Sequence, residues 1–412
     1  MPLIRPFPGL RPAPEHVAGV IAPPYDVLNS KEARARAAGK PHSFLHVSKP
    51  EIDLPANIDP YSLEVYERGR QNFQAMLAAG VIKRDPAPHY YFYRQVMGSH
   101  SQVGLVAAAS CADYASGRIR KHEHTQPAKE DDRVRQIDAL NAQTGPVFLT
   151  YRRSDKIDAL AKAVTAGAPD VDVTADDGVR HTLWVVSAPA QIAELSNAFA
   201  AVPRLYIADG HHRSAAALRV AEQRRAANRK HTGDEAYNYF LSVIFPDNQV
   251  QILDYNRVIR ELRVLTPASF VERLHTAFDV EKQGAPAKPT RLGEFGMYLA
   301  HQWYRLRVHT DKVPTDPVGR LDISVLQEQI IGPILGIADQ RRDKRIDFVG
   351  GIRGMKELER RVDSGEMAVA FAIFPTSLTD LMAVADAGEI MPTKSTWFEP
   401  KLADGMVSHA LD

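Results

Sequence analysis

A carboxylate, a glycine, two imidazoles and a guanidinium follow one another in the chain at Asp209, Gly210, His211, His212 and Arg213. The guanidinium of Arg213 can hold phosphate oxygens bidentately, and the two histidines can donate hydrogen bonds or transfer protons. Asp209 can bind a cation or accept the proton of a hydroxyl group. The residue types therefore suit phosphate chemistry. The alternative is an Asp209 that caps a helix and is followed by histidines on the surface.

The flanking sequence predicts that this motif lies at a turn from a strand into a helix. Residues 205–208 form a short apolar run typical of a buried strand, and residues 214–227 are rich in Ala and Leu with helical spacing. Gly210 permits backbone conformations that are closed to other residues. Because the first turn of a helix has free N–H groups and a partial positive charge, a phosphate would be stabilised there.

A second candidate follows two adjacent prolines near the amino terminus. Pro23 and Pro24 favour extended structure and fix the approach of Tyr25 and Asp26. A rigid loop of this kind can present an aromatic ring and a carboxylate to a ligand. A tight turn anchored by Tyr25 is the alternative.

Two histidines flank a glutamate at residues 122–124. His122 and His124 could bind zinc, but no third ligand is visible nearby and the usual helical zinc pattern is absent. Glu123 as a general base or Mg²⁺ ligand is the better functional interpretation. The alternative is a solvated charged loop that leads into a helix at residues 129–142.

Two polar groups later in the chain are further candidates. Asn256 and Arg257 follow an expected strand and could contact an anion, or could cap a turn. The segment 391–401 combines lysines, hydroxyl groups and aromatic rings. There Lys394 and Lys401 would supply positive charge and Ser395 and Thr396 hydroxyl donors, unless the segment is an ordinary carboxy-terminal strand.

The pattern of elements predicts an α+β fold with mixed sheets. Residues 89–96 and 103–111 read as a β-hairpin, residues 44–47 as a strand, and residues 145–209 as alternating strands and helices. A proline-bearing link at 283–290 places the expected boundary between a first domain, 1–282, and a second α/β region, 283–412, whose final segment returns to the site.

The composition excludes several classes of protein. In 412 residues, 51 Lys and Arg balance 50 Asp and Glu, so no global basic field indicates a nucleic-acid partner. One cysteine, Cys111, excludes an internal disulfide framework, and we expect it to be packed in the core. No apolar run approaches the roughly 20 residues that span a bilayer. We expect a cytoplasmic protein without a membrane partner.

Several motifs, in this order, resemble the bacterial and archaeal family catalogued as domain of unknown function 1015. These are Ala-Pro-Pro-Tyr-Asp-Val at 22–27, His-Glu-His-Thr at 122–125, Thr-Gly-Pro at 144–146, Ala-Asp-Gly-His-His-Arg at 208–213, Leu-Asp-Ile-Ser-Val-Leu at 321–326 and the segment 391–401. The resemblance spans nearly the whole chain, and the biochemistry of the family is not established.

The Asp-Gly-His-His-Arg motif is also similar to the second motif of the ParB and sulfiredoxin superfamily, which includes ADP-dependent free serine kinases. The resemblance implies a ParB/sulfiredoxin-like nucleotide-binding core whose turn holds nucleotide phosphates with Mg²⁺. Sulfiredoxin has a catalytic cysteine where this chain has His211, which speaks against sulfinic-acid repair. Partition proteins carry a helix-turn-helix domain that this sequence lacks, so DNA partitioning is disfavoured.

The function expected from these features is Mg²⁺-dependent phosphotransfer between ADP or ATP and a small hydroxylated metabolite, with serine or phosphoserine as first candidates in the kinase or phosphatase direction. The alternative is a nucleotide-binding regulatory module without turnover. The partners are then a nucleotide and a small molecule, and the chain could form a homodimer. The assigned roles are as follows: catalysis by Asp209, His211, Glu123 and Asp26; phosphate binding by Gly210, His212, Arg213, Lys394, Ser395, Thr396 and Lys401; substrate contacts by Tyr25, His122, Asn256 and Arg257; metal binding by Asp209 and Glu123.

Overall fold

The computed structural model describes residues 2–412 and divides the chain into two compact units. Unit 1 comprises Met1–Val250 and Pro400–Asp412, and unit 2 comprises Gln251–Glu399. Both units combine helices with mixed or antiparallel sheets, which confirms the α+β class. The division expected at 282/283 falls inside unit 2, because the strands on either side of the proline-bearing link belong to one sheet.

A nine-stranded mixed sheet forms the centre of unit 1, in the order β6-β11-β8-β12-β5-β4-β10-β9, with β1 beside β5. The pairs β11–β6 and β12–β8 are parallel and the others are antiparallel. The strands are β1 (Ile4–Arg5), β4 (Tyr90–Met97), β5 (His100–Ser110), β6 (Ile119–Arg120), β8 (Val147–Tyr151), β9 (Val171–Thr174), β10 (Arg180–Val186), β11 (Leu205–Asp209) and β12 (Tyr239–Pro246).

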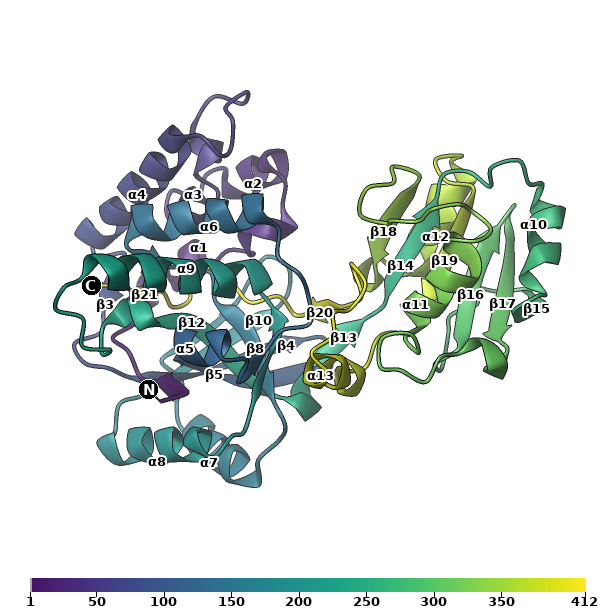
Figure 1. Cartoon of the computed structure of the whole chain (residues 1–412). Helices are drawn as coiled ribbons and strands as arrows, with labels where there is room; N and C mark the ends of the chain where they lie inside the picture. The colour runs from purple at the N-terminus through teal and green to yellow at the C-terminus, as the bar shows by residue number, and fades with distance from the viewer. Residues whose placement is uncertain (1) are drawn as a thin grey trace. The chain divides into compact units, whose positions relative to one another are not determined.

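Helices cover both faces of this sheet (Figure 1). On one face, α9 packs on α6, and α6 packs on α4; on the other face lie α7 and α8. Two short ribbons complete the unit, β2 with β3 and β7 with β21. The bounds are α1 (Val17–Val20), α2 (Ser30–Ala37), α3 (Leu45–Ser48), α4 (Leu63–Ala78), α5 (Cys111–Ala115), α6 (Pro127–Leu140), α7 (Asp155–Thr165), α8 (Pro189–Ala200), α9 (His211–Ala227), β2 (Leu10–Pro12), β3 (Ile82–Arg84), β7 (Ala142–Gln143) and β21 (His409–Ala410).

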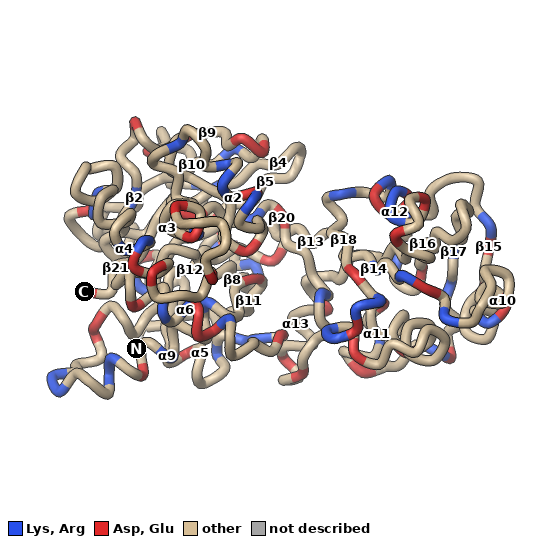
Figure 2. The backbone as a smooth tube through the Cα atoms, turned by 90° about the horizontal axis from the view of Figure 1, so that it is seen from above, with Lys and Arg blue, Asp and Glu red and all other residues tan. Residues whose placement is uncertain are grey.

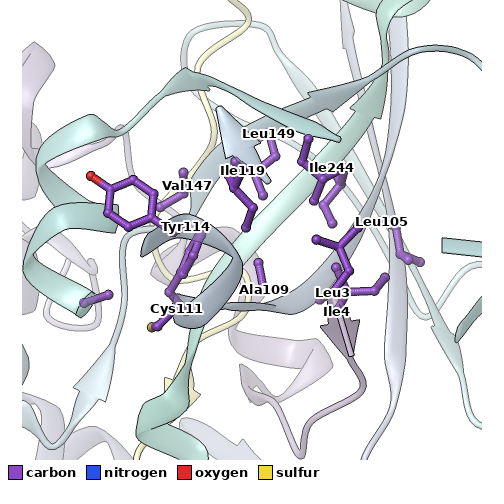
Figure 3. Packing of buried hydrophobic residues seen from close by; sticks show 14 of the residues in the cluster. Leu3, Ile4, Leu105, Ala109, Cys111, Tyr114, Ile119, Val147, Leu149 and Ile244 are labelled. Carbon is purple, nitrogen blue, oxygen red and sulfur yellow. The ribbon is translucent and has the colours of Figure 1, made fainter. Parts of the chain in front are cut away.

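The core of unit 1 is built from the apolar residues of the central strands. Leu149, Ile244 and Leu105 point into one cluster together with side chains from β1 and α5 (Figure 3). Cys111 is part of this cluster, as expected, and burial raises the pKa of its thiol to about 12. The cysteine is therefore an inert packing residue rather than a nucleophile.

Unit 2 is a six-stranded antiparallel sheet in the order β15-β17-β16-β19-β14-β18, flanked by helices. A separate pair, β13 with β20, joins its first and last residues. The bounds are β13 (Gln251–Leu253), β14 (Tyr255–Ile259), α10 (Pro267–Leu274), β15 (Phe278–Gln283), β16 (Glu294–Leu299), β17 (Gln302–Val308), α11 (Asp322–Leu326), a π-helical turn (Gln327–Ile331), β18 (Ile346–Gly350), α12 (Gly354–Asp363), β19 (Val369–Ile373), α13 (Leu378–Asp386) and β20 (Trp397–Glu399).

Charged residues of both signs are interspersed along the backbone of each unit (Figure 2). Among residues 2–412, no helix combines the length and the apolar composition needed to cross a bilayer. One expected element is wrong: residues 44–47, predicted as a strand, form the end of a turn and the helix α3.

Candidate functional site

The Asp209–Arg213 motif lies where β11 ends and α9 begins, as predicted. Gly210 occupies the N-cap position with φ of 101°, and no side chain caps the helix. Asp209 is the last residue of the strand, so the alternative in which it caps the helix does not hold. The helix begins at His211, three residues earlier than expected, and the backbone N–H of Ser214 donates to the carbonyl of Gly210. The earlier N–H groups therefore form the positive end of a 17-residue helix.

Arg213 is a buried cation in the first turn of α9. Its Nη1 donates to the carbonyl oxygen of Pro146, and its Nη2 lies 3.6 Å from Asp209 Oδ2 and 4.0 Å from Asp26 Oδ2. Burial would lower the pKa of this guanidinium, but the two carboxylates outweigh burial and raise it. A Cβ on Gly210 would lie 3.1 Å from Arg213 Nε, so the glycine lets the guanidinium lie against the turn.

Asp209 is held in its ionised form by two cations. Lys401 Nζ donates to Asp209 Oδ2 over 3.4 Å, and the side chain of Gln95 donates to the Lys401 carbonyl over 2.8 Å. Burial would raise the pKa of Asp209, but Lys401 and Arg213 outweigh it and hold this pKa well below its usual range. The carboxylate side chain keeps 33% of its surface exposed. It is therefore an anionic oxygen ligand that solvent and a cation can reach.

His211 and His122 form a buried pair of imidazoles. Their rings meet edge to face with centroids 4.5 Å apart, and the His122 backbone N–H donates to His211 Nε2 over 3.4 Å. Glu123 Oε2 lies 3.7 Å from His211 Nδ1. Burial lowers the pKa of His211, and the neighbouring imidazole of His122 lowers it further. Burial also lowers the pKa of His122, to about 4. Both rings are therefore neutral near pH 7, and His211 is not the surface residue of the alternative interpretation.

His212 belongs to the same turn, and Tyr25 lines a cavity together with Arg213. His212 Nε2 accepts a hydrogen bond from the backbone N–H of Gln126 over 3.1 Å, which joins α9 to the loop that carries Glu123. Tyr25 begins a short 3-10 turn, and its ring stacks under Arg133, whose Cζ lies 3.8 Å from the ring centroid. Burial raises the pKa of Tyr25 to about 12, so its hydroxyl group stays neutral.

Two residues of this region were not predicted from the sequence. Arg133 of α6 and Asp404 both line a small cavity of about 30 Å³ beside Arg213. Asp404 is 1% exposed, and neither of its carboxyl oxygens has a hydrogen-bond partner in the part of the chain that the structure describes. Burial raises its pKa to about 7. Its local sequence, Ala-Asp-Gly at 403–405, carries no signal, because its role depends on contacts with residues far away in the chain.

The other predicted residues belong to unit 2. Asn256 and Arg257 follow the strand β13, as expected, but they lie within the next strand, β14, rather than in a turn, and both are fully buried. The Asn256 side-chain oxygen accepts from the Ile373 backbone N–H over 3.0 Å, so this side chain joins two strands. Arg257 Nη2 donates to the carbonyls of Thr393 and Lys394 over 3.1 and 3.0 Å. Both side chains are therefore engaged in holding unit 2 together.

The segment 391–399 forms a turn and the short strand β20. Lys394 is exposed and has φ of 57°, and its Nζ lies 5.6 Å from the ring centroid of Tyr255. The Ser395 hydroxyl donates to the Pro392 carbonyl over 2.5 Å, and Thr396 is half-buried. A phosphate-binding role of Lys394, Ser395 and Thr396 stays a prediction.

Within residues 2–412, no cluster of three or more His, Cys, Asp or Glu side chains is arranged to hold a metal ion. A metal at Asp209 and Glu123 would need further ligands from a bound phosphate. Mg²⁺ commonly binds in this way, through one or two carboxylates together with substrate phosphates and water. The assignment of these two residues to a metal stays a prediction.

Solved structures resemble parts of this fold only weakly. A mutant free serine kinase in complex with ADP is 13% identical, with a TM-score of 0.33 over 72% of this chain and 87% of that one. A conserved hypothetical protein from Pyrococcus furiosus is 14% identical, with a TM-score of 0.34 over 73% and 93%. SbnI from Staphylococcus aureus, truncated at its carboxy terminus, is 12% identical, with a TM-score of 0.35 over 73% and 85%.

The search of the curated proteins finds no match. The family model described as "Protein of unknown function (DUF1015)" matches residues 4–324, which is most of the chain. The match covers the Asp209–Arg213 turn and the loops of Asp26 and Glu123. The chain belongs to the DUF1015 family.

Proposed function

We propose that unit 1 binds the phosphates of ADP or ATP at the start of α9 and transfers a phosphoryl group to or from a small hydroxylated metabolite. The observation that carries the proposal is the uncapped positive end of α9 with Arg213 and Lys401 on either side of the ionised Asp209. Helix ends of this kind favour phosphate, and two cations beside it add charge that phosphoryl transfer requires.

The charges around the turn support a site for a metal-bound phosphate. Asp209 is ionised and partly exposed, and Glu123 is 47% exposed, so both carboxylates are able to reach a cation. Mg²⁺, when bound, would neutralise phosphate charge during transfer. Arg213 would then hold the phosphate oxygens, and Lys401 would balance Asp209 before the metal binds.

Two carboxylates support the proton-transfer step. Glu123 lies 3.7 Å from the neutral imidazole of His211, and Asp26 lies 4.0 Å from Arg213, so each is at the edge of the cationic turn. Either would accept the proton of an attacking hydroxyl group. The motif's resemblance to that of the free serine kinases makes serine and phosphoserine the first molecules to test.

A regulatory nucleotide binder is the second candidate. Its support is the buried Arg213, which contacts Pro146, Asp209 and Asp26. A phosphate that binds Arg213 would change these contacts and so move the loops that carry Pro146 and Asp26. Such a protein would bind nucleotide tightly and produce no phosphorylated or dephosphorylated product.

The deciding measurement is ³¹P NMR of the full chain with Mg²⁺, in separate reactions with ATP or ADP plus serine and with phosphoserine. Wild type is compared with Asp209→Asn and Lys401→Met, and Lys156→Met serves as the control because Lys156 is an exposed lysine on α7. We expect transfer by wild type and the control, and a loss of roughly 10²-fold in each site variant.

The two candidates give different results. Nucleotide binding by calorimetry without product at any substrate would support the regulatory binder and overturn phosphotransfer. Neither binding nor product would overturn both. Equal rates in Asp209→Asn and the control would exclude this turn as the site.

A further inference from the structure

A cleft of about 410 Å³ opens in unit 2, and none of the residues assigned to the proposed phosphate site lines it. It lies between the first residues of β16, the last residues of β17 and the segment that leads into α11. Its volume is within the range of roughly 300–1,000 Å³ that is typical of small-molecule sites. The cleft is therefore large enough for a metabolite.

Asp322 lines this cleft with a carboxyl group that is only partly satisfied. The residue is 5% exposed; its Oδ1 accepts the Gly293 backbone N–H over 2.9 Å, and its Oδ2 has no hydrogen-bond partner among the described residues. Burial raises the pKa of this carboxyl to about 7. Since buried polar oxygens normally have partners, a hydrogen-bond donor is the missing component here.

Three arginines at the same cleft leave donor groups exposed. Arg291 Nε and Arg307 Nε lie 3.2 and 3.5 Å from the same oxygen of Glu294, and Arg320 Nη2 lies 2.5 Å from Asp380 Oδ1. Both carboxylates are nearly buried, whereas the arginine side chains are 42–70% exposed. The pairs neutralise the acids and still present guanidinium N–H groups to an acceptor.

The helix that carries Asp322 has an irregular continuation. After α11, the backbone changes to a π-helical turn at Gln327–Ile331. Such turns are rare and frequently occur at functional sites. Asp322 also belongs to the Leu-Asp-Ile-Ser-Val-Leu motif at residues 321–326, and no residue of this motif is part of the proposed phosphotransfer site.

We propose that this cleft binds a small zwitterionic metabolite of the amino-acid class, with its protonated amine at Asp322 and its carboxylate at the arginines. An ammonium group supplies the donor that Asp322 Oδ2 lacks, and a planar carboxylate suits a guanidinium. Between these ends, Leu292, Val308 and Val313 supply apolar walls for a side chain. No phosphotransfer at unit 1 is required for this binding.

The test uses the full chain and an equimolar mixture of the twenty standard amino acids, with binding detected by saturation-transfer NMR. Asp322→Asn changes the unpartnered oxygen into an amide at nearly constant shape. Asp279→Asn, an 81% exposed aspartate of the same unit, is the matched control, and Asp209→Asn separates this site from unit 1.

We expect at least one amino acid to bind wild type, Asp279→Asn and Asp209→Asn equally, and Asp322→Asn at least tenfold more weakly. Analogues of that amino acid without the amine or without the carboxylate should each lose at least tenfold. Arg291→Gln, a change at a 70% exposed side chain, provides a second test that does not disturb the core. The proposal is overturned if no amino acid binds, if both cleft variants bind like wild type, or if binding disappears in Asp209→Asn.

Discussion

Replacement of Gly210 by alanine tests whether the turn is built around Arg213. At φ of 101° an L-residue is strained by roughly 1–2 kcal/mol. The new Cβ would also lie 3.1 Å from Arg213 Nε and 3.3 Å from Val147 Cα. Overpacking of this kind costs roughly 1–3 kcal/mol, so we expect unit 1 to lose about 2–5 kcal/mol of unfolding free energy in Gly210→Ala.

Gly178 provides a matched control for the backbone contribution. Its φ is 82°, and a Cβ there would have nothing within 4 Å. Gly178→Ala should therefore cost only the backbone strain of roughly 1–2 kcal/mol. The difference between the two variants, about 1–3 kcal/mol, then measures the contact of Gly210 with Arg213 and Val147.

The assay is urea unfolding followed by pulsed hydrogen exchange and mass spectrometry, which reports peptides of unit 1 separately from those of unit 2. Midpoints are compared at unchanged m-value, since a changed m-value would indicate a changed denatured state. If Gly210→Ala is no less stable than Gly178→Ala, the guanidinium of Arg213 does not pack against the turn as described, and the argument for a pre-formed phosphate site fails.

Two further predictions concern buried charges. Burial raises the pKa of Asp404 to about 7 from an ordinary value of 3.8, so between these values the folded state holds a proton that the unfolded chain releases. The unfolding free energy of unit 1 should therefore fall as pH rises from about 4 to about 7, by up to about 4 kcal/mol. Asp404→Asn should remove this contribution. If the urea midpoint changes between pH 5 and pH 8 by the same amount in wild type and in Asp404→Asn, the prediction is contradicted. In unit 2, Arg257→Met leaves the carbonyls of Thr393 and Lys394 without their donor, so hydrogen exchange in residues 391–399 should accelerate about tenfold, while unchanged protection there would show that Arg257 does not hold this turn.

The elements around the motif could be predicted because their signals are local. An apolar run before Gly210 and an Ala-rich run after it give β11 and α9. The start of α9 was misplaced, since a glycine rather than Ser, Thr or Asp occupies the N-cap. Residues 44–47 were predicted wrongly because a run of four residues, three of them apolar, does not distinguish a strand from a helical turn. There Phe44 packs edge to face on Phe73 of α4, a tertiary contact that the local sequence does not reveal.

The candidate site was predictable to a lesser degree. Motif reasoning selected Asp26, Glu123 and Lys401 one by one, and the structure brings each of them to the Asp209–Arg213 turn. Asp404 was missed because nothing in its neighbours distinguishes it from a surface aspartate. Asn256 and Arg257 were taken as turn or ligand residues, although they lie inside a strand, because the sequence does not show which polar side chains satisfy buried backbone groups.

Unit 1 is discontinuous, and this has a consequence for the synthesis of the protein on the ribosome. Lys401, Asp404 and the strand β21 are made only after the whole of unit 2 has been translated. Until then β7 lacks its partner, and Asp209 lacks one of its two cations. A nascent chain that has already folded unit 2 therefore still lacks part of the proposed phosphate site. The surroundings of the Asp209–Arg213 turn are completed late in translation, whereas domains commonly fold in order from the amino terminus.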